Sequence, residues 1–472
     1  MRSQRVRAVV REVGAKVYVS RVRLRNVKGF HGARNVDLDL RRPDGSHEGW
    51  TVLAGRNGSG KTSLLRGIAL ALGGAGVARN LVSDFDNWIS TGEMTAIAEV
   101  MIAFDSRWEK FKTGRPPASG FWAGLSWTAP TMSAGNLRRP AQPSLTEHIS
   151  STNARTAARR GPWQENPTGW FYAAYGPFRR LVGGTGEAQR LMMTSGPVAR
   201  SASLFHEDAS LAEGVSWLIE QHLRSLEGKD GADTLKSAAL TILGDGLLPD
   251  DYHIDSVDSE GLWVVNDEHR FPLREMSDGY RTVVAFVVDL LKQLFEAYGY
   301  LPIGDSADSG RPVVRLPGVV IIDEVDAHLH VSWQQRIGKW LKDHFPSIQF
   351  IVTTHSPYIC QAADPAGLIR LPGPDEQLPP QTVSPDLWER IVYGTGDDAV
   401  LSDLFGLDTA YSAHATELRD ELVRLEIAVL DGKATEGDTE RYHDLKSTLT
   451  SSLASRVGEV IARVAVSGEG ER

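Results

Sequence analysis

The sequence predicts an α/β protein built around a mixed or largely parallel sheet, and three features of the chain support this prediction. An apolar run at 50–54 is followed directly by a glycine-rich segment and then by a helical pattern. Two further apolar runs, at 318–322 and 349–353, are continuous rather than alternating, as expected for central strands covered on both faces. A helical pattern at 331–344 separates them, so strands and helices alternate as they do in parallel sheets.

The bulk composition is that of an ordinary globular protein. The chain has 472 residues, 41% hydrophobic and 24% charged, so we expect a packed interior in two or three lobes. The formal net charge of −9 argues against a protein that coats nucleic acid without sequence preference. Residues 1–25 nevertheless carry eight basic side chains against one acid. Either a charge-protected edge strand or a local phosphate-binding surface explains this segment.

The cysteine content and the hydropathy indicate a cellular compartment. A single cysteine, Cys360, excludes an intrachain disulfide and suits a reducing environment. The basic N-terminus lacks the apolar run of a signal peptide, and no stretch of about 18 uncharged apolar residues occurs. We therefore expect a cytoplasmic protein without membrane insertion.

The first half of the chain combines regular patterns with one irregular stretch. Alternating apolar residues predict two strands within 16–40 and another at 96–104. The helix after the glycine-rich segment is expected to run from residue 62 to about residue 72 and to end at the glycines that follow. Residues 112–169 are rich in Pro, Gly, Ser, Thr and Arg, and we interpret them as a long loop or a partly ordered insert.

The second half is more regular. A strand is predicted at 170–175, a mostly helical stretch at 208–246, a hairpin at 253–272 and a helix at 278–298. Two amphipathic helices, 418–430 and 442–464, suit a helical hairpin. We expect four parts, with boundaries at 1–111, 112–252, 253–383 and 384–472.

The glycine-rich segment at 55–62 has the composition of a phosphate-binding loop. It satisfies the pattern G-x-x-x-x-G-K-[ST] between a strand and a helix. Its glycines allow backbone N–H groups to converge on phosphate oxygens. Lys61 is expected to reach the β and γ phosphates, and the Thr62 hydroxyl to ligate Mg²⁺. The predicted nucleotide contacts in this segment are Gly55, Arg56, Asn57, Gly58, Ser59, Gly60, Lys61, Thr62 and Ser63.

Two further groups follow predicted central strands. Asp323 and Glu324 end the run at 318–322; Asp323 would hold Mg²⁺, directly or through water, and Glu324 would orient or deprotonate an attacking water. His355 follows the run at 349–353, at the strand end where parallel sheets bind nucleotides, and would contact the γ-phosphate. A solvated strand tip and a structural histidine are the alternatives.

These three pieces, in this order, resemble the ABC ATPase family. That family has a signature loop upstream of the acid pair, and here 275–281 fills its place: Ser277 and Gly279 match, whereas Asp278 and Tyr280 depart. In the family the loop reaches across a dimer to the γ-phosphate held by the partner. The resemblance therefore implies that Ser277 and Gly279 contact nucleotide in trans; the alternative is a serine that caps an ordinary helix.

The segment at 22–30 resembles the first strand and turn of the SMC/RecF-like branch of these ATPases. This likeness implies Lys28 and Phe30 as accessory nucleotide contacts, against the alternative of a plain surface turn. His328 and His330 occupy the family's dimer-interface loop, which favours an interface over a metal site.

Other stretches, at 172–180, 203–218 and 400–407, are similar to standalone bacterial ATPases labelled "AAA family" and to ATPase subunits of antiphage systems such as Septu. The family's glutamine loop has no clear counterpart, and the turn at 175–180 is a candidate substitute. No nuclease motif is visible, so any cutting of nucleic acid would fall to a partner.

The resemblance implies an α/β ABC-type ATPase head with a mixed or parallel sheet, an inserted mostly helical lobe and a C-terminal helical segment. Lys61 and Asp323 lie 262 positions apart (323 − 61) without sustained heptads at 75–275, so the insert is compact rather than a long coiled coil. We expect Mg²⁺-dependent ATP hydrolysis that drives closure of a homodimer or higher even-numbered oligomer in defence or DNA repair. A nuclease or other effector and DNA are the candidate partners. The alternatives are a transporter's ATP-binding subunit and a regulatory scaffold that binds ATP with little turnover.

Overall fold

The computed structural model describes residues 17–130, 142–149, 151–179, 186–249, 251–267, 269–406, 409 and 411–449. The chain divides into two compact units, Met1–Gly406 and Leu407–Arg472. The finer division expected within these units stays a prediction.

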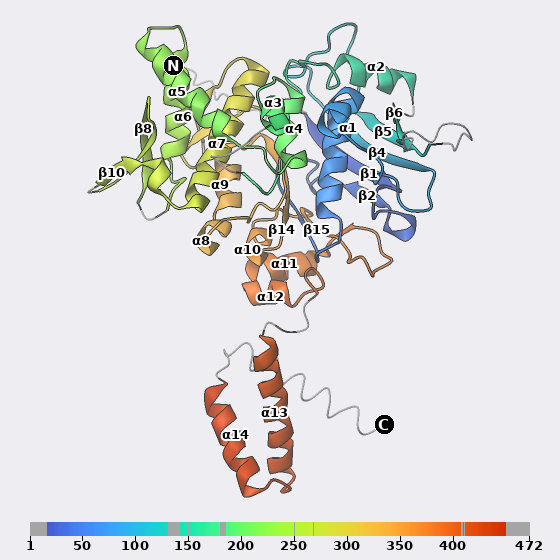
Figure 1. The fold of residues 1–472 in the computed structure, drawn as a ribbon, viewed down its shortest axis with the longest axis vertical. Helices are drawn as coiled ribbons and strands as arrows, with labels where there is room; N and C mark the ends of the chain where they lie inside the picture. Colours follow the sequence, from blue (N-terminus) through green and yellow to red (C-terminus); the bar gives the residue numbers. More distant parts are fainter. Residues whose placement is uncertain are drawn as a thin grey trace, which may run out of the picture. The chain divides into compact units, whose positions relative to one another are not determined.

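A six-stranded sheet lies at the centre of the first unit, in the order β16-β15-β3-β14-β13-β7 (Figure 1). Its strands are β3 (Gly49–Ala54), β7 (Tyr172–Tyr175), β13 (Gly318–Ile322), β14 (Ile348–Thr354), β15 (Leu368–Arg370) and β16 (Gln381–Thr382). All neighbours in it pair in parallel except β16, which is antiparallel to β15. Strands β7, β13 and β14 are buried along their whole length. The mixed α/β fold with a largely parallel sheet is therefore confirmed.

A second sheet is antiparallel, in the order β2-β1-β4-β5-β6. Its strands are β1 (Tyr18–Arg25), β2 (Val36–Asp39), β4 (Thr95–Ala103), β5 (Phe121–Thr128) and β6 (Ser144–Glu147). Helix α1 (Lys61–Leu81) contacts β4, β5 and β6 of this sheet and also β13 and β14 of the central sheet. The helix that begins in the glycine-rich loop is thus held by both sheets.

The basic first strand is not an edge strand, because β1 lies between β2 and β4. Arg21 and Arg23 pair with Asp37 of β2, and Arg23 also approaches Glu99 of β4 at 3.5 Å. The expectation of a charge-protected edge is therefore wrong for this strand. The basic residues before position 17 lie outside the described residues.

Of the two interpretations of 112–169, the long loop is also wrong, whereas the partly ordered insert stays a prediction. Strands β5 and β6 and helix α2 (Thr152–Arg160) form within it, and β5 contacts both α1 and α2. Gly124, one of the glycines of this segment, lies in the interior of β5, where a Cβ atom would come within 2.6 Å of the Cβ of Glu99 on β4. Glycine at this point marks close approach of two backbones rather than a chain turn.

The sequence predicted that helix α1 ends at its glycines, and this prediction is wrong. It continues to Leu81 across a break at Gly74, whose backbone angles are φ 78° and ψ −178°. The indole ring of Trp163 fills the break: a Cβ on Gly74 would lie 2.6 Å from the ring, and Trp163 Nε1 donates to the carbonyl of Ala71 at 3.0 Å.

Substitution by alanine at two glycines of this helix should consequently change the free energy of unfolding in opposite directions. Gly74→Ala should lower the free energy of unfolding by about 1–3 kcal/mol, because its backbone angles are nearly exclusive to glycine and the ring of Trp163 blocks the methyl group. Gly76→Ala should raise that free energy by up to about 1 kcal/mol, since Gly76 is exposed, lies in the helix and has open space around it. Urea unfolding followed by tryptophan fluorescence compares the two. Equal effects would contradict the account of the break.

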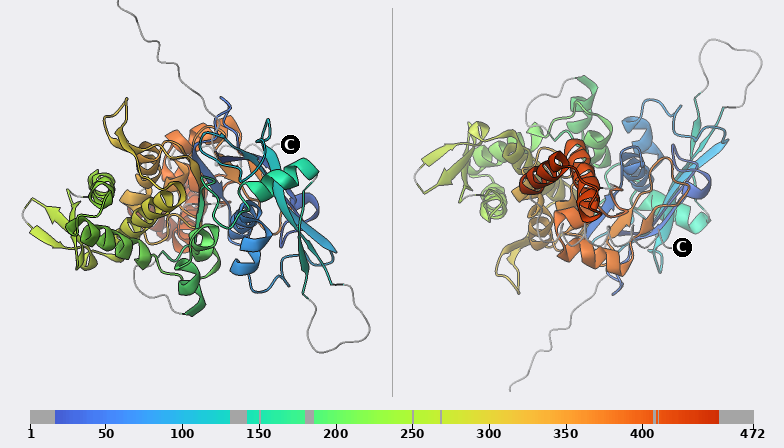
Figure 2. Two further views of the ribbon diagram at one scale, coloured as in Figure 1. Left: turned by 90° about the horizontal axis from the view of Figure 1, so that it is seen from above. Right: turned by 90° about the horizontal axis from the view of Figure 1, so that it is seen from below.

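Part of the first unit forms a lobe on the other side of the central sheet from the antiparallel sheet (Figures 1 and 2). A three-stranded sheet, β8 (His253–Asp258), β9 (Gly261–Asn266) and β10 (His269–Pro272), packs with α5 (Ala212–Leu226) and α6 (Ala232–Gly244). Helix α7 (Asp278–Tyr298) contacts α5 and α6 and begins where the sequence placed it. Helices α3 (Gly186–Met192) and α4 (Pro197–Phe205) were not predicted.

Short elements complete the first unit. They are β11 (Ile303–Asp305), β12 (Pro312–Val314), α8 (Val331–Gln334), α9 (Ile337–His344), α10 (Pro357–Cys360), α11 (Pro385–Tyr393) and α12 (Gly396–Val400). The helix predicted at 331–344 is thus two helices, α8 and α9.

The second unit contains the predicted helical hairpin. Helices α13 (Ala413–Leu430) and α14 (Glu436–Thr448) pack against each other, and Arg441 of α14 pairs with Glu421 of α13 at 2.9 Å. The part of the second predicted helix beyond residue 449 lies outside the described residues. Across the described part of the chain, no helix has the length and apolar character that a membrane crossing requires.

Candidate active site

Four parallel strands bring the predicted functional groups to one edge of the central sheet. Strand β3 leads into the glycine-rich loop, β13 into Asp323 and Glu324, β14 into His355, and β7 into a turn at 176–179. Ligands bind at the carboxyl ends of such strands. The Thr62 hydroxyl donates to Asp323 at 2.7 Å, so the two residues predicted as metal ligands are in direct contact.

The glycine-rich loop has the backbone geometry that its sequence requires. Gly58 (φ 77°) and Gly60 (φ 97°) both lie in the left-handed region, which favours glycine. The Lys61 ammonium donates to the carbonyls of Gly55, at 2.8 Å, and Arg56, at 3.2 Å. Burial lowers the pKa of Lys61, while the carboxylates of the acid cluster oppose that shift.

Exposure differs along the loop. Arg56, Asn57 and Gly58 are exposed, whereas Ser59 and Lys61 are buried. Helix α1 begins at Lys61, so Thr62 and Ser63, both half-buried, stand in its first turn. The middle of the loop and the helix N-terminus are therefore the parts that an anion can reach.

Phe30 and Arg34 support the loop from beneath. Phe30 is only 1% exposed, and a Cβ on Gly60 would lie 2.6 Å from its ring. The Arg34 guanidinium donates to Ser59 at 3.3 Å and to Pro372 at 3.1 Å, in both cases to the main-chain carbonyl. Phe30 therefore packs under the loop, and its predicted contact with nucleotide stays a prediction. The part played by Arg34 was not foreseen, because a surface-type residue in a turn gave no sign of burial.

The acid pair is held by hydroxyl groups from the neighbouring strand. Asp323 is 2% exposed and accepts hydrogen bonds from Thr62 and from Thr353, the latter at 2.5 Å. The Thr353 hydroxyl also accepts from the backbone N–H of Glu324 at 2.7 Å, and Glu324 has a left-handed backbone (φ 46°). Thr354 donates in the same way to Asp326 at 2.5 Å. The sequence pattern Thr-Thr-His suggested only the histidine.

His355 is exposed beside this cluster. Its pKa is lowered, first because surrounding atoms partly desolvate the ring and second because the positive charge of Lys61 lies nearby. The imidazole is therefore mainly neutral at neutral pH. His328 and His330 are exposed as well, and the described residues contain no group of three or more His, Cys, Asp or Glu arranged to hold a metal.

The candidate signature loop meets the loop that follows the acids. Ser277 stands at the N-cap position of α7 and is exposed, but its side chain does not cap this helix. A Cβ on Gly279 would collide with the carbonyl oxygen of His328, which explains why glycine occupies that position. Asp278 forms an ion pair with Arg281, so its charge is partly compensated.

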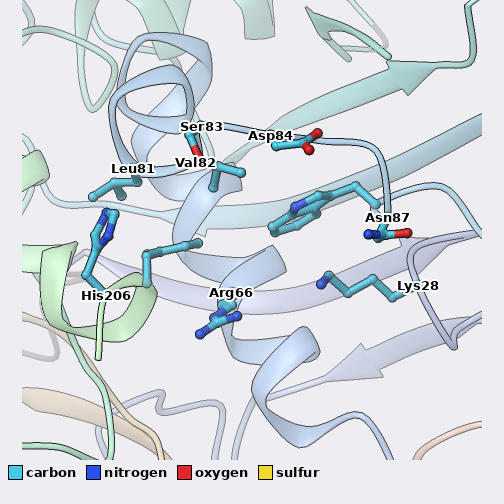
Figure 3. A pocket seen from close by; sticks show the side chains of 10 residues that line it. Lys28, Arg66, Leu81, Val82, Ser83, Asp84, Asn87 and His206 are labelled. Atoms are coloured by element: carbon cyan, nitrogen blue, oxygen red, sulfur yellow. The ribbon is translucent and has the colours of Figure 1, made fainter. Parts of the chain in front are cut away.

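Lys28 lines a hollow of about 340 Å³ beside α1 (Figure 3). Figure 3 shows Lys28 and Arg66 on one side of this hollow and Ser83 and Asp84 on the other. The Lys28 ammonium lies 5.1 Å from the ring centre of Trp88. Its pKa is lowered, mainly by burial and then by the charge of Arg66. Arg66 was not predicted, because a single arginine on a helix carries no distinctive pattern.

Comparison with known proteins agrees with this geometry. Residues 21–107 match a family described as "AAA domain", and residues 219–361 match one described as "AAA domain, putative AbiEii toxin, Type IV TA system". The first segment contains the glycine-rich loop, and the second contains the candidate signature loop, the acid pair and His355. ATP binding is implied by an AAA domain.

Similar proteins include the Septu protein PtuA of Bacillus mycoides (strain KBAB4), 23% identical over 356 residues that cover 74% of this chain and 40% of that protein. A second is the "Retron Ec83 probable ATPase" of Escherichia coli, 40% identical over 90 residues that cover 19% of this chain and 15% of that protein. The chain is related to the Septu PtuA and retron ATPases. It spans half or less of the length of the curated relatives it matches.

Among solved structures, the "SmcHead bound to the C-winged helix domain of ScpA" aligns with a TM-score of 0.42 and 15% identity. The alignment covers 78% of this chain and 97% of that chain.

Removal of the Thr353 hydroxyl tests how the acid pair is held. Thr353→Val keeps the side-chain shape but leaves the Glu324 N–H and one oxygen of Asp323 unpaired, so the free energy of unfolding should fall by about 1–3 kcal/mol. Thr353→Ser retains the hydroxyl, so its free energy of unfolding should fall less than that of Thr353→Val. Thr382→Val, on the exposed strand β16, is the matched control and should change stability by less than about 0.5 kcal/mol. Equal losses in Thr353→Val and Thr382→Val, measured by urea unfolding, would contradict this account.

Proposed function

We propose that this chain binds ATP together with Mg²⁺ and hydrolyses it at the edge of the central sheet. The observation that carries the proposal is the direct contact between Thr62 and Asp323. It joins the glycine-rich loop to the acid pair, although the two segments lie far apart in the sequence. Glu324 and His355 lie at the same sheet edge, as a water-activating carboxylate and a γ-phosphate contact require.

The donor groups suit Mg²⁺. This ion prefers oxygen ligands, keeps several of its waters and is commonly held by one or two carboxylates plus substrate phosphates. Thr62 and Asp323 supply one hydroxyl and one carboxylate, so a site of this type needs no cluster of three acidic or histidine side chains. When bound, Mg²⁺ would neutralise phosphate charge during hydrolysis.

In this proposal each residue of the candidate site has a separate role. The backbone N–H groups of the loop and Lys61 bind the phosphates, and Glu324 orients or deprotonates the attacking water. The hollow lined by Lys28 and Arg66 receives the nucleoside part of ATP. Its position supports this, since Arg66 is one helical turn beyond Thr62, a rise of about 6 Å along α1.

Closure of two copies over ATP is the second part of the proposal. The exposed Ser277 hydroxyl at the N-terminus of α7 is free of its own helix, and a helix N-terminus favours an anion. Gly279 lies against His328, which belongs to the loop that follows the acid pair. Within one chain, that loop and the candidate signature loop therefore form one surface. A second copy would present the same surface, as a two-fold dimer requires.

The biological role proposed is an ATP-dependent switch in a defence or DNA-repair system. The relatives named Septu PtuA and retron ATPase support the first of these settings. A homodimer or higher even-numbered oligomer would act on a separate effector, such as a nuclease, or on DNA. Stimulation of ATP hydrolysis by linear duplex DNA would favour DNA, and indifference to DNA would favour a protein partner.

Substitutions of Lys61 and Glu324 test binding and turnover separately. Lys61→Ala should abolish ATP binding, because the phosphates lose their main counter-charge. Glu324→Gln should bind ATP with unchanged affinity while kcat falls by about 100-fold or more, since the group that activates water is lost. Fluorescent-nucleotide titration and steady-state phosphate release measure the two properties.

The matched control is Glu389→Gln on the exposed face of α11, which should leave both properties unchanged. Wild-type affinity in Lys61→Ala would refute the assignment of the phosphate loop. Wild-type turnover in Glu324→Gln would refute the assignment of the water-activating acid.

The closure step has its own test. Glu324→Gln should form dimers with ATP in light scattering, because slow hydrolysis prolongs the closed state. Adding Ser277→Arg to this variant should abolish the ATP-dependent dimer and keep ATP affinity, since a long cation blocks the proposed contact. Ser309→Arg, in an exposed loop, serves as the control and should leave dimerisation intact. Glu324→Gln that remains monomeric with ATP would exclude closure of this kind.

A further inference from the structure

Arg179 is a buried arginine in the turn that follows β7. It is 4% exposed, and its guanidinium donates to four main-chain carbonyl oxygens. One nitrogen reaches Gly176 at 2.9 Å and Asp323 at 3.0 Å. The other reaches Glu324 at 3.1 Å and Val325 at 3.3 Å. A single side chain therefore contacts three consecutive residues of the acid-pair loop.

The main-chain carbonyls of residues 323–325 require a planar, multiply donating partner such as a guanidinium. Strand β13 ends at Ile322, and the chain then turns through the left-handed backbone of Glu324, so the next carbonyls leave the ladder of the sheet. Buried carbonyl groups without a partner are costly. A guanidinium offers five N–H donors in a planar fork, whereas a lysine ammonium offers three donors from one point. Arginine alone among the side chains can serve four acceptors in this arrangement.

The charge of Arg179 is balanced by its surroundings. Burial lowers the pKa of Arg179 to about 10, and the nearby charges of Asp326, Asp323 and Glu324 oppose that shift. Arg179 therefore remains protonated at neutral pH. Its positive charge also offsets the repulsion among the three carboxylates.

The turn that carries Arg179 is anchored on both sides. Tyr175 accepts from the backbone N–H of Asp323 at 2.8 Å, and its hydroxyl donates to the buried Asp289 of α7 at 2.9 Å. A Cβ on Gly176 would collide with the carbonyl oxygen of Ser203 in α4. Arg179 thus reaches the acid pair from a fixed frame.

We propose that Arg179 is a positioning residue, which sets the backbone conformation of residues 323–325 and thereby the direction of the Glu324 carboxylate. It acts through main-chain carbonyls and does not itself touch nucleotide. This inference rests on the proposed ATPase function for its effect on turnover, but its effect on the backbone can be measured without turnover.

Two substitutions of Arg179 separate positioning from binding. Arg179→Ala should lower kcat by about 100-fold, the loss expected when a reacting group is misplaced by roughly 1 Å, while ATP affinity stays unchanged. Guanidinium ion added to this variant should restore part of kcat, because it can occupy the vacated site. The kcat of Arg179→Lys should lie between those of Arg179→Ala and the wild type, since lysine restores the positive charge but not the planar fork of donors.

Arg200 provides the matched control. It is also a buried arginine, on α4, and its guanidinium lies 5.5 Å from the ring centre of Phe171. Arg200→Ala should lower thermal stability while its folded fraction keeps wild-type kcat and shows no rescue by guanidinium. Wild-type kcat in Arg179→Ala, or a parallel loss of ATP affinity, would overturn the positioning role.

If the wild-type chain shows no ATP turnover, the proposed function is wrong, but the positioning role of Arg179 is not thereby refuted. Amide hydrogen exchange then tests that role directly. The Glu324 N–H donates to the Thr353 hydroxyl, and the Val325 N–H donates to the Thr353 carbonyl at 3.0 Å. In Arg179→Ala both amides should exchange faster than in the wild type and in Arg200→Ala. Unchanged exchange at these two amides would overturn the inference whatever the ATPase result.

Discussion

The buried carboxylate of Asp323 is the group on which the arrangement of the site depends. A carboxylate removed from water is tolerated only where donors surround it. Here Thr62 of α1 and Thr353 of β14 both donate to it. Its own backbone is held as well, by the Tyr175 carbonyl on one side and by Arg179 on the other. Three other segments, each distant from Asp323 in the sequence, therefore meet at this residue.

The balance of charge explains why such a cluster suits a metal-bound phosphate. Asp323, Glu324 and Asp326 place three carboxylates in one small region, and phosphates alone would be repelled by them. Lys61 and Arg179 supply two opposing charges at its border, and both are buried. A divalent cation beside Asp323 would complete the compensation and draw phosphate oxygens to the same place. A cation would thus make the acids and the glycine-rich loop compatible in one phosphate site, which is why the proposed function includes Mg²⁺.

The strongest sequence patterns predicted the fold and the position of the site. Continuous apolar runs identified β3, β13 and β14, and because their carboxyl ends share one edge, the pattern at 55–62 and the acids at 323–324 could be placed together in advance. Strand β5 was missed, since the glycine- and proline-rich composition of 112–169 favours a loop, and the close approach of Gly124 to β4 is a tertiary property. Arg34 and Arg179 were missed as supports for a similar reason. Their partners are main-chain carbonyls, which every residue possesses, so no pattern of residue types reveals them.

Helix α4 contacts two of the elements that build the candidate site. The Ser203 carbonyl lies against Gly176 in the turn that carries Arg179. The next carbonyl, that of Leu204, accepts from the Arg66 guanidinium of α1 at 3.0 Å. Two adjacent residues of α4 therefore contact the turn that carries Arg179 and the helix that follows the glycine-rich loop. Because packed elements shift as units, a displacement of α4 would move both the turn that carries Arg179 and helix α1. Under the proposed function, α4 is the element through which the binding of a partner would reach the ATP site.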